Sequence, residues 1–514
     1  MTNSLYQELF EKHRLSEKIF LSLQNQHTVT YKEYINSVEK ISFFFKEKGL
    51  YPGDRVALKL KKSHYFLSIY GACIHRGLIF LPLNHNSTDD ELLYFLKDSE
   101  SKLLITDKET CFQLKNKKLD KTFSIETVEL DGSGSISNSS LKNKHYEKKP
   151  IERNLNDIAA ILYTSGTTGR SKGAMITQEN LLSNAKTLRE YWCFDCEDNL
   201  IHALPIYHTH GLFVATNVIL LSSAKMIFLE KFELETITNN LPYATVLMGV
   251  PTYYSRLLES KKLTKLLVKN IRLFISGSAP LTKETNDRFF KATGKRILER
   301  YGMTETNMIC SNPYKGYRIS GKVGFPLPGI DVRIVDQLSG QLLSHGQVGE
   351  IQVKGKNVFS GYWKMPSKTA DSFTKDNYFK TEDLGTFDNN GYLEIVGRLK
   401  DLIISGGFNV YPKEIEDVIN SIEGIKENAV IGVPHKDLGE SILSIIIKEE
   451  SIQIDSKKIS EILTKKLAKY KCPFSNLILI FSKYLVKSLS ILRHDFFISH
   501  QFLYKILIIS LYNS

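Results

Sequence analysis

Short apolar runs alternate with helical patterns along most of this sequence, and that alternation constrains the fold more than any other feature. Residues 55–60 (RVALKL), 78–84 (LIFLPLN) and 102–107 (KLLITD) are typical of buried strands. The segments 29–50 and 65–77 carry apolar residues at helical spacing. Continuously apolar strands separated by helices are characteristic of a largely parallel sheet that is covered by helices. The alternation therefore predicts an α/β fold.

A polar stretch at residues 131–150 interrupts the alternation and predicts a surface loop. Further strand-like runs follow at 158–164, 199–206, 225–230, 244–251, 271–277 and 296–302. Around Gly397–Asp401 the pattern changes to that of a smaller unit, and 514 residues exceed one ordinary core. We predict a large N-terminal domain of two α/β subdomains at residues 1–398, a small α+β domain at 399–473, and an aberrant tail at 474–514.

The composition excludes several classes of protein. The 68 basic and 56 acidic residues give a net charge of +12, but they are scattered, which suits small anionic ligands better than nucleic acid. Six cysteines in a chain of this length predict free thiols in a reducing compartment. The polar N-terminus lacks the apolar core of a signal peptide, and residues 1–473 contain no apolar run long enough to span a bilayer. We expect a cytoplasmic protein without a nucleic-acid or membrane partner, unless the tail is genuine.

The segment 162–174, LYTSGTTGRSKGA, directly continues the strand-like run 158–164 although glycine is costly inside strands and helices. Its glycines allow backbone N–H groups to turn toward one point, its hydroxyl groups add donors, and Lys172 adds a mobile charge, so the segment suits a polyphosphate. The residues concerned are Thr164, Ser165, Gly166, Thr167, Thr168, Gly169 and Lys172. A flexible Ser/Gly linker is the alternative, but a linker is not expected to follow directly on an apolar strand.

A second glycine-rich segment, GYRISGKV at residues 316–323, approaches the Walker A pattern. Val323 stands where that pattern requires a hydroxyl side chain that binds Mg²⁺, and no strand precedes the segment. We therefore exclude it as a phosphate site.

The glycine-rich loop resembles the phosphate loop of the adenylate-forming superfamily, which includes acyl-CoA synthetases, luciferases and adenylation domains. Other motifs of that superfamily follow in order, namely RYGMTET at 300–306, GEIQVKG at 349–355, YFKTEDLG at 378–385 and GRLKDLIISGGFNVYPKEIE at 397–416. The segments 202–218, 246–258 and 272–281 resemble the malonyl-CoA synthetases in particular. The resemblance implies a malonate–CoA ligase that uses ATP and Mg²⁺ and forms malonyl-CoA, AMP and pyrophosphate.

Adenylation brings a carboxylate against the α-phosphate of ATP, so the site must supply positive charge, and a divalent ion is the usual source. The resemblance implies that Glu305 binds Mg²⁺ and that Thr304 lies near the α-phosphate. It also implies that Asp383 accepts hydrogen bonds from the ribose hydroxyls and that Arg398 contacts ribose or phosphate. The remaining residues of the ATP site would be Gly277, Ser278, Ala279, Tyr301 and Gly302.

A malonate enzyme must neutralise a second carboxylate, which is costly to bury unpaired, and arginine is the suitable partner. The resemblance implies that Arg256 grips this distal carboxylate, with Ser278 adding a hydroxyl group; a helix-surface arginine is the alternative. His208 and His210 would lie near the acyl pocket, His208 with a catalytic role and His210 at the carboxylate. Isolated histidines are more often structural, and the paired setting leaves both interpretations open.

The small domain would rotate about a hinge near Lys400–Asp401 after the adenylate forms, again by resemblance. Gly406 and Gly407 would then line the tunnel for the pantetheine arm of CoA. Two adjacent glycines after a strand are equally compatible with a tight turn.

The resemblance ends at Pro473. The superfamily places a Gly-Lys pair beyond this point, whose lysine bridges the substrate carboxylate and the α-phosphate, but residues 474–514 contain no glycine. We transfer no catalytic role to Lys483 or Lys487. The tail is rich in Phe, Ile, Leu, Ser and Lys, which is typical of AT-rich DNA read out of frame, so we favour a frameshift over a genuine amphipathic or membrane-associated tail.

Without that lysine the chain as written is expected to be impaired in adenylation. Three alternatives stay open: a ligase for methylmalonate or another short acid such as acetate, an inactive remnant that only binds nucleotide, and a membrane-tethered scaffold.

Overall fold

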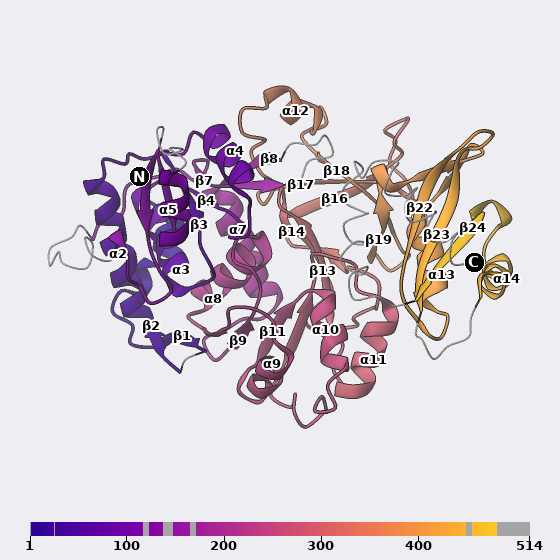
Figure 1. Cartoon of the computed structure of the whole chain (residues 1–514), viewed down its shortest axis with the longest axis horizontal. Coiled ribbons are helices and arrows are strands. Elements are labelled where there is room, and N and C mark those ends of the chain that lie inside the picture. The colour runs from indigo at the N-terminus through magenta and orange to yellow at the C-terminus, as the bar shows by residue number, and fades with distance from the viewer. Residues whose placement is uncertain are drawn as a thin grey trace. The chain divides into compact units, whose positions relative to one another are not determined.

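A computed structural model describes residues 2–24, 26–116, 123–136, 148–164, 171–448 and 455–480 of the chain (Figure 1). Its contacts divide the chain into two units. The first comprises Met1–Thr381 and Gly385–Ile395, and the second comprises Glu382–Leu384 and the chain from Val396 onward. The first unit is α/β and the second is a small α+β unit, which confirms the predicted fold class. The domain boundary after residue 398 stays a prediction.

The first unit contains a six-stranded sheet in the order β6-β5-β3-β4-β7-β8. Neighbouring strands are parallel except for the last pair, β7 and β8, which are antiparallel. The strands are β3 (Arg55–Lys59), β4 (Ile79–Pro82), β5 (Leu103–Thr106), β6 (Ser124–Thr127), β7 (Ile158–Thr164) and β8 (Lys172–Thr177). The strand-like runs at 55–60, 78–84, 102–107 and 158–164 are thus confirmed as strands.

A nine-stranded sheet in the order β15-β14-β13-β12-β11-β9-β10-β1-β2 forms the second sheet of this unit. Its strands are β1 (Ile19–Leu23), β2 (Thr28–Thr30), β9 (Asn199–His202), β10 (Lys225–Phe228), β11 (Val246–Gly249), β12 (Leu273–Ser276), β13 (Leu298–Met303), β14 (Asn307–Ser311) and β15 (Phe325–Pro326). The central run from β1 to β13 is parallel. Strands β9, β10, β11 and β12 of this run are almost completely buried, as the apolar runs predicted.

Six helices of the first unit, α1, α2, α3, α4, α7 and α11, begin at a side-chain cap. Thr30 and Thr88 each form a capping box with the glutamate three residues later, Glu33 and Glu91, which satisfies the first free N–H groups of α2 and α4. The helices are α1 (Ser4–Leu9), α2 (Tyr31–Glu47), α3 (His64–Arg76), α4 (Asp89–Ser99), α5 (Lys108–Asn116), α7 (Gln178–Tyr191), α8 (Asn217–Ser222), α9 (Leu234–Asn240), α10 (Pro251–Leu258), α11 (Lys283–Thr293) and α12 (Pro366–Asp371). Helix α7 contacts β8 of one sheet and β14 of the other, so it joins the two sheets within this unit (Figure 1).

A four-stranded sheet in the order β16-β17-β18-β19 follows in the chain. Its strands are β16 (Ile330–Val335), β17 (Gly349–Gly355), β18 (Phe379–Phe387) and β19 (Leu393–Arg398). Ile309, Ile334, Ile351, Val353 and Leu393 form a core cluster here.

The described part of the second unit contains a five-stranded sheet and two α-helices. The sheet has the order β21-β20-β23-β22, and β24 also pairs with β23. Its elements are β20 (Ile403–Ser405), β21 (Phe408–Val410), α13 (Pro412–Asn420), β22 (Ile425–His435), β23 (Gly439–Lys448), α14 (Ser456–Lys466) and β24 (Ser475–Ile480). Its core contains Ile415 and Ile419 of α13 together with Ile459 and Leu463 of α14.

Within the ranges that the structure describes, no helix is both long and apolar enough to cross a membrane.

Candidate active site

The segments that follow β9, β11, β12 and β13 carry eight of the residues that the sequence singled out. These four strands are parallel neighbours, so their carboxyl ends meet at one edge of the nine-stranded sheet. Ligands of open α/β sheets bind at such edges. His208 and His210 follow β9, Arg256 follows β11, Gly277–Ala279 follow β12, and Thr304 and Glu305 follow β13.

The glycine-rich segment connects β7 to β8. Thr164 ends β7 and pairs across the hairpin with Lys172, the first residue of β8. The intervening residues Ser165, Gly166, Thr167, Thr168 and Gly169 lie outside the described residues. Lys172 was expected to be a mobile charge, but its side chain is buried, with Nζ 5.5 Å from the centroid of the Tyr362 ring.

Glu305 occupies the turn between β13 and β14 and is buried. Its Oε1 accepts a hydrogen bond of 3.0 Å from the hydroxyl of Tyr362. Its carbonyl oxygen accepts a bond of 2.7 Å from the backbone N–H of Phe359. Thr304, its neighbour in the turn, is half-buried. The lysine of the β7–β8 hairpin and the predicted metal ligand thus contact the same tyrosine, which the sequence did not indicate.

Ser278 and His210, which were both predicted at the substrate carboxylate, contact each other, and Arg300 joins them. Nδ1 of His210 lies 3.3 Å from Oγ of Ser278, and Nη2 of Arg300 donates to the same oxygen at 3.3 Å. His210 opens a π-helical segment, His210–Thr216, a rare form that is frequent at functional sites. Ser278 has a φ of +71°, a strained conformation for a residue other than glycine.

Arg300 is buried in β13, and no carboxylate of the described residues forms an ion pair with it. Burial lowers the pKa of its guanidinium to about 9, so the group remains protonated at neutral pH. Burial and the Arg300 charge hold the pKa of His210 well below its usual range, so His210 is neutral. Nε of Arg300 and Nε2 of His210 are buried without a hydrogen-bond partner.

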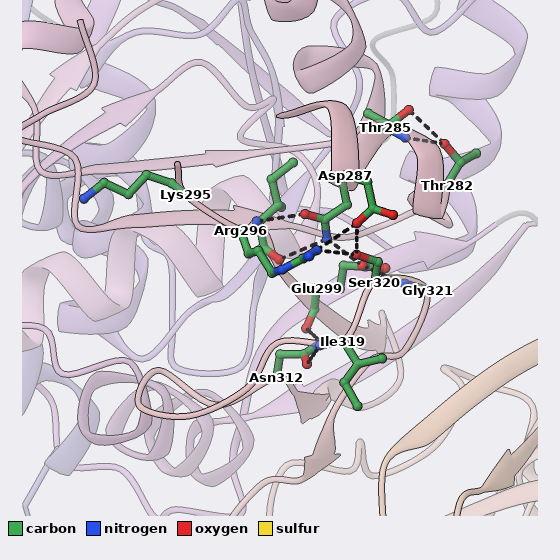
Figure 2. Close-up of polar contacts among 12 residues, drawn as sticks. Thr282, Thr285, Asp287, Lys295, Arg296, Glu299, Asn312, Ile319, Ser320 and Gly321 are labelled. Carbon is green, nitrogen blue, oxygen red and sulfur yellow. Dashed lines mark hydrogen bonds and ion pairs between the residues drawn. The ribbon is translucent and has the colours of Figure 1, made fainter. Parts of the chain in front are cut away.

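The acid next to Arg300 in the sequence does not neutralise it. Adjacent strand residues point to opposite faces of a sheet, and Oε1 of Glu299 accepts instead from the side chain of Asn286 at 3.0 Å and from the backbone N–H of Gly321 at 2.9 Å. Figure 2 shows Glu299 beside Ser320 and Gly321, in the loop that follows β14.

The same loop contains the Walker-like segment 316–323. The backbone N–H of Gly321 binds the Glu299 carboxylate, and Nζ of Lys322 forms an ion pair of 2.5 Å with Asp388 (Figure 2 shows the former contact). Both groups that would hold a phosphate therefore have acidic protein partners. These contacts agree with the exclusion of this segment as a phosphate site.

Arg256 and His208 lie at exposed positions. Arg256 is exposed on α10, and its guanidinium lies 5.9 Å from the centroid of the Phe232 ring. The His208 ring lies 4.5 Å from the Tyr207 ring. The distal-carboxylate role of Arg256 stays a prediction.

In the second unit, Nε of Arg398 and Oδ1 of Asp383 form an ion pair of 3.1 Å. Asp383 is buried and Arg398 is exposed. Lys400 lies exposed in a single 3₁₀ turn, Leu399–Asp401.

Gly406 and Gly407 form the two-residue turn of the hairpin between β20 and β21, with φ values of +56° and +80°. Two successive positive φ values are typical of the tight hairpin turn in which glycine is preferred. The turn alone therefore accounts for both glycines, and a role in CoA binding stays a prediction.

Arg300 and Tyr362 are the two residues of this region that the sequence reasoning missed. Arg300 lies within the strand-like run RILERYG. Arginine is rare in a buried strand, so its presence there could have indicated a functional residue. Tyr362 carried no comparable signal, because its contact with Glu305 spans 57 residues of sequence.

Comparisons with known proteins agree with this geometry. The model of the AMP-binding enzyme family matches residues 10–363, and that of the AMP-binding enzyme C-terminal domain matches residues 414–482. Among solved structures, ATP-bound MatB from Rhodopseudomonas palustris has 44% sequence identity and a TM-score of 0.90, over 95% of this chain and 99% of that chain.

A second solved structure, o-succinylbenzoate coenzyme A synthetase from Bacillus subtilis in complex with ATP and magnesium ion, has 26% identity and a TM-score of 0.80, over 93% of this chain and 96% of that one. Among curated proteins, the malonate–CoA ligase of Arabidopsis thaliana is 33% identical over 461 residues, which are 83% of this chain and 74% of that protein. The chain therefore belongs to the AMP-binding enzymes and is an adenylate-forming acid–thiol ligase.

Proposed function

We propose that this ligase joins malonate to coenzyme A, forming malonyl-CoA, AMP and pyrophosphate through a malonyl-adenylate. The observation that carries the proposal is the buried guanidinium of Arg300, which has no carboxylate partner among the described residues. A buried charge without a partner is costly. A substrate with a second carboxylate would supply the missing partner, whereas a fatty acid would bring apolar surface against the charge.

The hydrogen-bond donors around Arg300 support an anionic ligand. A guanidinium can only donate, so Ser278 Oγ accepts from Arg300 and keeps its own proton to donate to Nδ1 of His210. That arrangement favours the His210 tautomer protonated at Nε2. The unpartnered atoms, Nε of Arg300 and Nε2 of His210, are then both donors. Two donors beside a buried charge match the two oxygens of a carboxylate.

Relatives support the same acid. The Arabidopsis relative is a malonate–CoA ligase, and MatB is a malonyl-CoA synthetase. Arg256 would then lie at the rim of the acid site, where an exposed arginine can attract dicarboxylates by charge. His208, which is also exposed, would lie near the reacting carboxylate.

The described residues fit Mg²⁺ that arrives with ATP. None of the residues that the structure describes belong to a group of three or more His, Cys, Asp or Glu side chains able to hold a metal. Mg²⁺ is usually held by one or two carboxylates together with substrate phosphates and water, so the single carboxylate of Glu305 is sufficient. Mg²⁺ would supply positive charge to the phosphates, while Lys172 and the β7–β8 loop bind them and Thr304 lies near the α-phosphate.

The remaining nucleotide and CoA roles are assigned by resemblance. Gly277, Ser278 and Ala279 would admit the adenine, and Tyr301 and Gly302 would also belong to the ATP site. Asp383 would bind the ribose hydroxyls, and Arg398, its ion-pair partner, would contact ribose or phosphate. In the second half-reaction Lys400 would act as the hinge, and Gly406 and Gly407 would face the pantetheine arm of CoA.

The test compares acids in the Arg300→Met variant. Relative to wild type, kcat/KM for malonate should fall by about 100-fold, because removing one partner of a buried charge pair costs about 2–4 kcal/mol. Acetate has no second carboxylate, so kcat/KM for acetate should stay within twofold of the wild-type value. An equal loss for both acids would remove the specificity role of Arg300.

Two further measurements test which arginine binds the distal carboxylate and which acid is the substrate. Arg256→Ala should lower kcat/KM for malonate less than Arg300→Met does; the opposite order would make Arg256 the main carboxylate ligand. Methylmalonate has the same two carboxylates, and a higher wild-type kcat/KM for it than for malonate would assign the chain to that acid instead.

A further inference from the structure

One segment of the first unit contacts both the β7–β8 hairpin and the turn between β13 and β14 that contains Glu305. Residues Gly361–Trp363 run antiparallel along β8: the N–H of Met175 donates to the carbonyl of Gly361 at 2.9 Å, and the N–H of Trp363 donates to that of Gly173 at 2.7 Å. Just before this segment, the N–H of Phe359 donates to the carbonyl of Glu305. The backbone thus places the residue between Gly361 and Trp363 beside both elements.

That residue is Tyr362, which is 7% exposed. One face of its ring lies 5.5 Å from Nζ of Lys172, a distance at which an ammonium is attracted to the ring. Its hydroxyl donates to Oε1 of Glu305 at 3.0 Å. A phenylalanine would fill the same space and keep the ring contact, so Tyr362→Phe isolates the contribution of the hydroxyl, which includes the bond to the Glu305 carboxylate.

We propose that Tyr362 is a positioning residue for Mg²⁺ and ATP, which fixes the Glu305 carboxylate with its hydroxyl and the Lys172 ammonium with its ring. The proposal rests on ATP and Mg²⁺ binding as part of the proposed function. Carboxylates that bind metals are usually oriented by a hydrogen bond from a neighbouring group, and loss of that neighbour typically weakens metal binding. A single residue would thereby set the distance between the two charges that ATP must bridge.

The first test is calorimetric titration of the full chain with ATP, once with excess Mg²⁺ and once with EDTA. Tyr362→Phe should weaken binding of Mg²⁺-ATP by about tenfold or more, and binding of ATP in EDTA should stay within twofold. Tyr362→Leu also removes the ring, so it should weaken ATP binding under both conditions. The matched control is Tyr378→Phe, which removes a hydroxyl bonded to the exposed carboxylate of Asp331 and should change neither titration.

Two results would overturn the proposal. Wild-type affinity of Tyr362→Phe for Mg²⁺-ATP would show that the hydroxyl does not position the carboxylate. An equal loss in Mg²⁺ and in EDTA would assign Tyr362 a structural role only. If the wild-type chain bound no ATP at all, the proposed function itself would fail, and that result is distinct from both.

A second measurement uses a double-mutant cycle for Mg²⁺-ATP binding. If the Tyr362 hydroxyl acts through Glu305, then Tyr362→Phe should cause no further loss once Glu305→Gln is present. Independent losses that multiply in the double variant would contradict the coupling, even if each single variant binds weakly.

Discussion

Gly277 lies directly against the guanidinium of Arg300: a Cβ atom at position 277 would stand 2.3 Å from Cζ and 2.4 Å from Nε of Arg300. Real Cβ atoms do not approach other atoms so closely. The absence of a side chain at Gly277 therefore leaves the space that the Arg300 guanidinium occupies. The resemblance implies that the same glycine also lies near the adenine.

Gly277→Ala should displace Arg300 and reduce kcat/KM for malonate by about tenfold, because a charge moved from its productive position loses part of its interaction with the carboxylate. Acetate should be affected much less. The control is Ser276→Ala, which removes a buried hydroxyl that has no hydrogen-bond partner and should change kcat/KM little. A loss of the same size with acetate would show that the glycine serves the nucleotide instead.

Lys172→Ala should weaken ATP binding by about tenfold or slow adenylation, because a charge directed at phosphate is lost. AMP lacks the β- and γ-phosphates and should bind nearly as before. Calorimetric titration with both nucleotides checks this. The surface lysine Lys186, paired with Glu8, provides the control Lys186→Ala. Unchanged ATP affinity together with unchanged adenylation would favour the alternative that the glycine-rich segment is a flexible linker.

The stability of the first unit should fall as the pH drops below about 6.5. Burial lowers the pKa of His13 to about 4, and its Nε2 lies 2.8 Å from the carbonyl of Leu220. The neutral ring is therefore favoured in the folded state, so its contribution is present above the unfolded pKa and is lost as the pH falls toward 4. Between pH 6.5 and 5 this loss is about 2 kcal/mol.

Thermal unfolding at pH 7.5 and pH 5 measures this effect. His13→Gln can keep a donor for the carbonyl of Leu220 but cannot titrate, so the difference between the two midpoints should shrink. The exposed residue His345 supplies the control His345→Gln, which should leave the difference unchanged. An unchanged difference in His13→Gln would mean that other groups account for the pH dependence.

The chain as written is expected to be slowed in malonate-dependent pyrophosphate exchange by about 10²–10³-fold, because residues 474–514 contain no glycine and therefore no Gly-Lys pair of the kind that the resemblance implies. Supplied malonyl-adenylate and CoA should still give thioester if the second unit folds. Residues 475–480 form β24, and the family match extends to residue 482, so the start of the tail takes part in the fold. Pyrophosphate exchange at the full rate would show that the lysine is dispensable or replaced.

The sequence predicted what local patterns control. The apolar runs of β3, β7 and β12 became buried strands because a strand between neighbours needs apolar groups on both faces. Ser278 and His210 lie together because their segments leave two parallel strands of one sheet, β12 and β9, at the same end.

Long-range contacts could not be predicted in this way. Lys172 was expected in a loop, but the hairpin pairs it with Thr164 and buries it against Tyr362. Arg256 and Arg300 both stand in matching motifs, and periodicity alone cannot tell that the first is exposed on a helix and the second buried in a strand.

The pairing of β23 with β24 has a consequence for synthesis of the chain. Leu443–Lys448 of β23 form their parallel ladder with Ser475–Ile480. A ribosome must therefore add about thirty residues after β23 before this part of the strand can pair with β24. Until then, Ile445–Ile447, which are buried in the finished unit, lie in a strand without this neighbour. Nascent chains and products stopped before residue 475 expose an unpaired apolar edge, which makes them substrates for chaperones and prone to aggregate.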